Sequence, residues 1–159
     1  MPTSAERHEL INQLRDLPAQ LENVAGDLDD EQLDTPYRDG GWTVRQVVHH
    51  LADSHMNAFI RMKLTLTEDA PLFRTYEQDE WARLPDTAAA QIYSSLLLLR
   101  GLHERWANLL EKLPSESWTR AGVHPQNGEV TLDNLLASYV AHGARHLHQV
   151  AALREARGW

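Results

Sequence analysis

The stretch TVRQVVHHLADSHMNAFIRMKLTLT (residues 43–67) decides the fold, because its apolar residues recur at the spacing of an amphipathic helix. Thr43 and Gln46 fit a capping box, in which each side chain satisfies an unpaired backbone N–H of the first helical turn. We therefore expect a helix that begins at Thr43 and ends near Thr67. Its buried stripe comprises Val44, Val47, Val48, Leu51, His55, Ala58, Phe59 and Met62.

Three other segments have the same periodicity. The first carries Leu10, Leu14, Leu17, Leu21, Val24 and Leu28, and we expect Pro18 to kink or restart it. The second begins near Asp86 and ends at Pro114. The last runs from Leu132 to Arg157, with Thr131 as its cap.

The intervening stretches indicate loops. Residues 35–43 and 114–130 are rich in turn residues, and residues 68–85 are expected to form a loop that can include one short helical turn. The strand-like GEVTL (128–132) is too short to count. Four amphipathic helices around one core predict an all-α protein, a four-helix bundle that forms a single domain over residues 1–159.

Composition narrows the function. The chain has 159 residues and no cysteine, so disulfides and thiolate metal sites are excluded and a cytoplasmic location is the default. The formal net charge of −8 opposes binding to a nucleic-acid backbone. No apolar run approaches the roughly 20 residues that span a bilayer, and the N-terminus has no secretory pattern. We expect neither a nucleic acid nor a membrane as partner.

The segment AHGARHLHQV (141–150) holds three histidines. At about 100° per residue, His142 and His146 lie about 40° apart inside the apolar stripe, whereas His148 points to the opposite side and is expected to be solvated. A buried imidazole without partners costs on the order of 1–3 kcal/mol. A shared metal ion removes that cost, since histidines at i and i+4 can converge on one ion. Hydrogen-bonded core histidines and a wet groove are the alternatives.

A third ligand would have to come from another helix. The helical wheel places His55 and His103 in the middle of their stripes, His50 on a flank and His49 facing away. Periodicity therefore ranks His55 and His103 above His50 and leaves the choice open. His124 lies on a predicted loop, where exposure is the simpler interpretation.

Several of these motifs resemble a known family. YRDGGWTVRQVVHHLADSHMN (37–57), LHERW (102–106) and the terminal H-x-x-x-H followed by Gln149 closely resemble the YfiT branch of the DinB-like proteins. Members are four-helix bundles that hold a divalent ion on three histidines. In their pattern the first ligand stands eight residues after the tryptophan that opens the second long helix. The resemblance therefore implies His50 as that ligand, with His142 and His146 as the others, and His55 remains the competitor.

The resemblance also implies a function. The family is described as metal-dependent hydrolases and, for this branch, as bacillithiol S-transferases. We expect one Zn²⁺ or Ni²⁺ per chain and a transferase that uses bacillithiol as co-substrate to conjugate an electrophilic small molecule. A hydrolase that activates water and a non-enzymatic metal-binding stress protein are the alternatives. No catalytic residue is assigned beyond the metal centre, and the family implies a homodimer.

Overall fold

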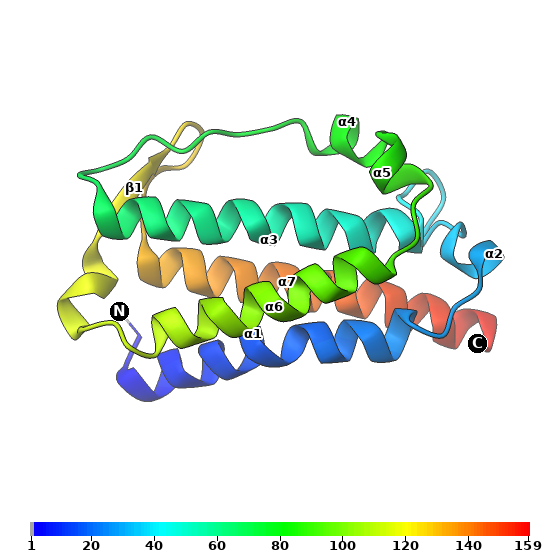
Figure 1. The fold of residues 1–159 in the computed structure, drawn as a ribbon, viewed down its shortest axis with the longest axis horizontal. Helices are drawn as coiled ribbons and strands as arrows, with labels where there is room; N and C mark the ends of the chain where they lie inside the picture. Colours follow the sequence, from blue (N-terminus) through cyan, green and yellow to red (C-terminus); the bar gives the residue numbers. More distant parts are fainter. Residues whose placement is uncertain (1) are drawn as a thin grey trace.

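Four long helices form the bundle in the computed structural model, which describes residues 2–159 (Figure 1). They are α1 (Ser4–Ala25), α3 (Val44–Thr67), α6 (Tyr93–Leu110) and α7 (Leu132–Arg157). The shorter elements are α2 (Asp30–Leu33), α4 (Gln78–Ala82), α5 (Pro85–Ala88), the 3-10 helix η1 (Ser115–Thr119) and the strands β1 (Ala121–His124) and β2 (Gly128–Thr131). None of the helices within residues 2–159 is long and apolar enough to cross a membrane. The predicted four-helix bundle is confirmed.

Two pairs of neighbouring helices in the bundle are parallel. In Figure 1, α3 and α1 lie on opposite sides of the bundle, with α6 and α7 between them. Ion pairs join Arg7 to Asp133 near the start of α1 and α7, and Arg154 to Asp27 near their ends, so these two helices run parallel. The neighbours α3 and α6 are also parallel. A parallel pair needs a long return, which residues 68–92 provide by crossing along the outer side of α3 (Figure 1).

The apolar core is divided into two clusters along the bundle axis. One contains Leu14, Phe59, Met62, Trp106 and Val140 among others. The other contains Leu21, Val48, Leu51, Leu99 and Val150 among others. On each of the four long helices, the residues midway between the two clusters belong to neither of them. His55 on α3, His103 on α6 and His142 and His146 on α7 lie at that level, and His50 contacts His142 from its edge, so a polar layer crosses the middle of the bundle.

Pro18 does not restart the first helix, which was one of the two outcomes that we expected, because α1 continues from Ser4 to Ala25 with Pro18 buried inside it. Proline has no N–H, and therefore gives no helical hydrogen bond to the carbonyl of Leu14 four residues earlier. The imidazole of His103 on α6 takes that place, with its Nδ1 2.5 Å from the Leu14 oxygen. A bond from another helix thus satisfies the carbonyl that the proline leaves free.

The start of the third long helix was also predicted wrongly. Residues 85–88 form the separate short helix α5, and α6 begins only at Tyr93 rather than near Asp86. The carbonyl of Ala90, between the two, accepts a hydrogen bond from Arg45 Nη1 (3.0 Å) and contacts His49 Nε2 (3.0 Å). These contacts hold the backbone at Ala90 against α3 in a non-helical conformation, so that α5 and α6 are separate helices.

The stretch 114–130 is more ordered than predicted. β1 and β2 pair as an antiparallel hairpin with His124 opposite Gly128, although GEVTL was judged too short to count. The loop between the strands is residues 125–127, and Gly128 follows it with a φ of +73°, a backbone conformation that favours glycine. Gly122 lets the ring of Phe73 pack against the backbone, since a Cβ there would lie 2.2 Å from it. The hairpin therefore forms through packing against the crossing segment, which strand length alone does not reveal.

The capping box at the start of α3 yields a test of the fold. The Thr43 hydroxyl accepts a hydrogen bond from Gln46 N (3.2 Å), and Gln46 Oε1 accepts one from Thr43 N (2.9 Å). Thr43→Ala should lower the free energy of unfolding of the metal-free protein by about 1 kcal/mol, because it removes the cap. Thr43→Ser keeps the hydroxyl and should stay near the wild type. Urea denaturation measures both, and equal stability of the two variants would contradict the capping role.

Candidate metal centre

Three histidines from two helices converge in the polar layer. α3 carries His50, and α7 carries His142 and His146 one turn apart. One ring nitrogen from each lies within 4.8 Å of the other two, and this is the cluster of potential metal ligands found in residues 2–159. The Nε2 atoms of His50 and His142 are 3.1 Å apart. Two ligands at 2.0–2.1 Å from one ion stand roughly 3 Å from each other, so this spacing suits a shared ion.

Burial keeps these imidazoles neutral. Burial, with smaller effects of the neighbouring His146 and of the Arg145 guanidinium, lowers the pKa of His50 to about 3 and that of His142 to about 3. Burial also lowers the pKa of His146. A histidine binds a metal only in its neutral form, so the chemistry of the three side chains fits a divalent ion at neutral pH.

A directed chain of hydrogen bonds determines which nitrogen of His142 is available. The Leu14 carbonyl can only accept, so His103 Nδ1 must carry the proton, and its Nε2, 2.9 Å from His55 Nδ1, must accept. Burial lowers the pKa of His103 to about 4 and that of His55 well below its usual value, so both rings are neutral. His55 Nε2 then accepts in turn from His142 Nδ1 at 3.4 Å. The chain leaves the lone pair of His142 on Nε2, which faces His50.

Two further contacts orient the cluster. Gln149 Oε1 lies 2.8 Å from His146 Nδ1 and can only accept, so the lone pair of His146 is also on Nε2. The indole of Trp42 covers His50 at 4.5 Å between ring centroids and stacks on His146 at 6.3 Å. Its N–H donates to Asp79 Oδ1 at 3.0 Å, which ties the crossing segment to the site.

The structure also places the other histidines. His55 and His103, which periodicity ranked above His50, are fully buried in the hydrogen-bond chain and lie outside the three-histidine cluster. His49 was expected to face away, but it is buried against Ser95 and Ala90. His148 is exposed, as predicted. A wheel of one helix cannot show that α6 covers one flank of α3 while α7 meets the other.

Two cavities flank Trp42. One, of about 400 Å³, is lined by Arg61, Tyr76, His124 and Tyr139 among others. The other, of about 360 Å³, is lined by Arg38, Arg145, His146 and Gln149 among others. Trp42 and Asp79 belong to both linings, so their hydrogen bond stands between the two spaces.

Sequence reasoning missed part of this lining. Arg61, Tyr139 and Trp42 received no role at the site, and His124 was expected to be exposed. Helical spacing could have identified two of these residues. Arg61 is eleven residues after His50 and Tyr139 is three before His142, so each lies on the same side of its helix as the candidate metal ligand. Tyr76 and His124 lie outside the long helices, so helical spacing could not find them.

The fold and the site define a class: a four-helix bundle with a buried three-histidine centre that is able to hold a metal ion. The chain belongs to the DinB superfamily, whose pattern matches residues 13–150. Its relatives include YfiT of Bacillus subtilis, named "Putative metal-dependent hydrolase", with 46% identity over 97% of this chain and 87% of that protein. A protein of the same description from Geobacillus kaustophilus is 49% identical over 98% of this chain and 88% of its own.

Solved structures agree with this family assignment. The structure of YfiT from Bacillus subtilis matches with a TM-score of 0.98 and 44% identity, covering 100% of this chain and 91% of that one. It is described as having an unusual four-helix bundle topology. A second four-helix bundle protein, TT2238, matches with a TM-score of 0.62 at 18% identity, over 92% of this chain and 98% of its own, which supports the fold alone.

The hydrogen-bond chain should set metal affinity. His103→Leu removes the acceptor of His55, and should raise the dissociation constant for Zn²⁺ by 10-fold or more, within the ~10–100-fold range of such orienting contacts. His103→Gln restores one donor and one acceptor and should recover part of the affinity. Pro18→Ala gives the Leu14 carbonyl a helical donor that competes with His103, so it should weaken metal binding while leaving α1 at least as stable. Competition with a chelating dye measures all three, and unchanged affinity in the leucine and alanine variants would refute the orienting role.

The metal-free protein should lose stability in acid. Burial lowers the pKa of His103 to about 4 and that of His142 to about 3, from 6.5. The unfolded chain therefore binds more protons below pH 6.5, and the free energy of unfolding falls by up to about 1.4 kcal/mol per pH unit for each such histidine until the folded pKa is reached. Burial raises the pKa of Asp53 to about 6, so the folded chain binds one proton there before the unfolded chain does, and this partly offsets the loss of stability. Urea denaturation with a chelator at pH 7.5, 6 and 5 should show the decline, and a flat profile would contradict neutral burial.

Proposed function

We propose that the protein is a divalent-metal-dependent transferase, in which His50, His142 and His146 hold one Zn²⁺ or Ni²⁺ ion and a low-molecular-weight thiol attacks an electrophilic small molecule. The observation that supports it is a neutral three-histidine cluster with a separate cavity on each side of Trp42. A reaction between two substrates needs two neighbouring binding spaces, whereas hydrolysis needs only one besides water. The chain has no cysteine, so the thiol must come from a co-substrate.

Three protein ligands are typical of a catalytic rather than a structural ion, because they leave coordination positions open. A bound divalent ion would act as a Lewis acid that lowers the pKa of a thiol or of water. The residues of the chain do the rest. The Leu14–His103–His55 chain and Gln149 hold two ligand rings, and Trp42 shields the cluster from solvent on one side.

Bacillithiol is the thiol implied by the resemblance to the YfiT branch. Its carboxylates would suit the cavity that Arg38 and Arg145 line, which lies directly beside His146. In the reaction with an aryl chloride, a carbon–sulfur bond forms and the carbon–chlorine bond breaks. Chloride leaves with the electron pair, and the thiol proton passes to solvent. The homodimer implied by the resemblance stays a prediction.

A metal-dependent hydrolase is the second candidate, and the names of the relatives favour it. It would use the same three ligands to activate water, so the ligands do not separate the two reactions. The choice of nucleophile does: a transferase consumes an aryl chloride only when bacillithiol is present, whereas a hydrolase cleaves an ester or amide without any thiol.

Metal analysis and a nucleophile panel test the proposal together. We expect one divalent ion per chain, lost in the double variant His142→Ala, His146→Ala and kept in His148→Ala, which changes an exposed histidine of the same helix. Conjugation should require both the ion and bacillithiol, and should fall at least about 100-fold in the double variant. A metal-loaded protein that ignores thiols but cleaves an ester would replace the proposal with the hydrolase. Full metal content in the double variant would refute the ligand set.

A further inference from the structure

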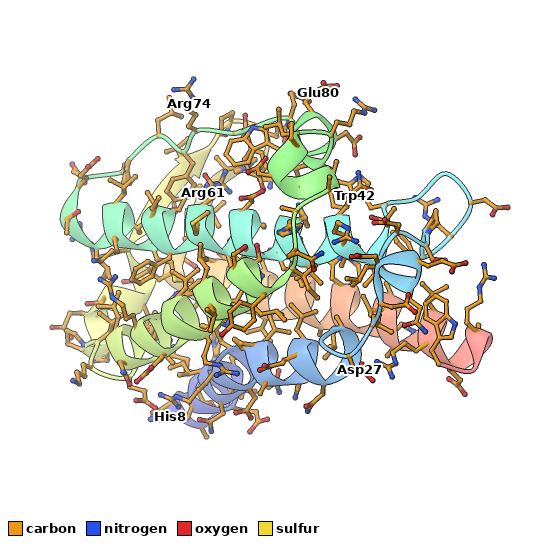
Figure 2. All side chains as sticks on the ribbon, turned by 45° about the vertical axis from the view of Figure 1, so that its right-hand side comes forward. His8, Asp27, Trp42, Arg61, Arg74 and Glu80 are labelled. Atoms are coloured by element: carbon orange, nitrogen blue, oxygen red, sulfur yellow. The ribbon has the colours of Figure 1, made fainter. Side chains whose placement is uncertain are left out.

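The 400 Å³ cavity next to Trp42 has a largely polar wall. It lies between α3, α7 and the segment that joins α3 to α6. Trp42 belongs to its lining and also covers the three-histidine cluster. Figure 2 shows Arg61 and Trp42 on the side of α3 that faces the segment carrying Arg74 and Glu80. None of the three histidines belongs to the cavity lining, so Trp42, which contacts both, connects the cavity to the metal centre.

Arg61 brings a positive charge to this cavity and is not in an ion pair with either carboxylate of the lining. Its Nη1–H donates to the Tyr139 hydroxyl at 2.9 Å, and its Nη2–H donates to the backbone oxygen of Arg74 at 2.7 Å. Within residues 2–159 it takes part in none of the ion pairs. A guanidinium has five N–H donors, so three remain after these two bonds.

Three more groups in the same lining hold a proton to donate. The Tyr139 oxygen accepts from Arg61, which leaves its own O–H free. The Tyr76 hydroxyl is buried without a hydrogen-bond partner in residues 2–159: the neighbouring Ser54 lowers its pKa but is not in hydrogen-bonding geometry. Burial nevertheless raises the pKa of Tyr76 to about 12, so the group stays protonated.

His124 supplies the third of these donors. Its Nδ1 accepts the backbone N–H of Gln126 at 3.2 Å. Burial, with a further effect of the Arg61 charge, lowers the pKa of His124, so the ring is neutral at pH 7 and its one proton is on Nε2. The two carboxylates of the lining belong to exposed residues of the crossing segment, Glu77 and Asp79, and Asp79 already accepts from Trp42. The other polar side chains of the lining, those of Ser54, Thr75, Gln78 and Gln126, are uncharged, so Arg61 is the one permanent cation of the lining.

We propose that this cavity binds the carboxylate of the electrophilic substrate, with Arg61, Tyr139, Tyr76 and His124 as the groups that recognise it. The proposal rests on the proposed function, since it assigns the second of the two flanking spaces to the second substrate. The Tyr76 hydroxyl is the one buried donor without an acceptor in residues 2–159, and such a group costs free energy. A carboxylate, with two oxygens and about four lone-pair sites, can accept from it and from the less buried donors of Arg61, Tyr139 and His124 at once.

The helices set the length of such a substrate. Tyr139 and His146 lie on one face of α7, seven residues apart, which corresponds to a rise of about 10 Å. His142 is between them, and its ring meets that of Tyr139 edge-on at 6.1 Å. A carboxylate at Arg61 and a reacting carbon beside the cluster therefore suit a small molecule in which the two are separated by about one aromatic ring. 4-Chloro-3-nitrobenzoate has this form.

Equilibrium binding tests the proposal without any turnover. The probe is 3-nitrobenzoate, which has no leaving group, compared with its neutral analogue 3-nitrobenzamide in calorimetric titrations of the zinc-loaded protein. We expect the wild type to prefer the carboxylate by about 10-fold or more, as a charge-assisted hydrogen-bond pair allows. Arg61→Gln should abolish the preference, Arg61→Lys should keep part of it, and Tyr139→Phe should reduce it. Arg145→Gln is the matched control, because it removes a cation from the other cavity and should leave the preference intact.

Competition with metal coordination is resolved in the same experiment. The titrations are repeated with metal-free protein, where the carboxylate preference and its loss in Arg61→Gln should persist. Equal affinity for the acid and the amide in wild type would overturn the proposal, as would a preference that disappears in Arg145→Gln or in metal-free protein. Thermal unfolding of each variant shows whether the fold is retained. If Arg61→Gln is unfolded, Arg61→Lys and Tyr139→Phe decide the outcome.

Turnover separates this proposal from the proposed function. With bacillithiol, 4-chloro-3-nitrobenzoate should have a lower KM than 4-chloro-3-nitrobenzamide, and Arg61→Gln should raise only the former, with kcat changed little. If neither compound is conjugated but the carboxylate preference in binding remains, the transferase fails and the carboxylate site stands. Conjugation with equal KM values for the two compounds would retain the transferase and refute the carboxylate site.

Discussion

The structure depends on one carbonyl oxygen. Because Pro18 lacks an N–H, the backbone oxygen of Leu14 is free to accept from the side of α1 that faces the bundle. His103 donates to it from α6 at 2.5 Å, and that contact gives direction to every hydrogen bond after it. An oxygen that can only accept forces His103 to accept on its other nitrogen, and the same logic passes through His55 to His142. Contacts from α1, α6 and α3 therefore determine which nitrogen of His142, on α7, presents its lone pair to the cluster.

The same layer explains why the bundle has two apolar clusters rather than one continuous core. Buried imidazoles are expensive unless their nitrogens are paired, and here the pairing is supplied within the layer itself or by backbone oxygens and Gln149. The apolar clusters on either side provide the burial that keeps the rings neutral. Stability and the capacity to bind a metal thus come from one arrangement, and not from a site added to a finished core.

The long helices and two of the three candidate ligands could be predicted from the sequence, whereas contacts between different helices could not be predicted from periodicity. The spacing of apolar residues predicted α3 and α7 correctly, since each buries a continuous stripe and begins at a threonine cap. It placed His142 and His146 together because they share one helix. The spacing ranked His55 above His50, because a helical wheel of one helix contains no information about which helices pack against it. Only the resemblance around Trp42 pointed to His50. The hydrogen bond that compensates Pro18 and the donors of the 400 Å³ cavity depend on contacts between segments far apart in the chain, which no local pattern encodes.

Nitrogen NMR of the histidine rings can show directly whether the hydrogen-bond chain from Leu14 sets the protonation of His142. In zinc-loaded protein with ¹⁵N-labelled histidine, long-range proton–nitrogen correlations report which ring nitrogen carries a proton and which binds the ion. We expect His142 to bind through Nε2 with a proton on Nδ1, and His103 to carry its proton on Nδ1 with Nε2 unprotonated. Coordination of His142 through Nδ1, or a proton on His103 Nε2, would contradict it.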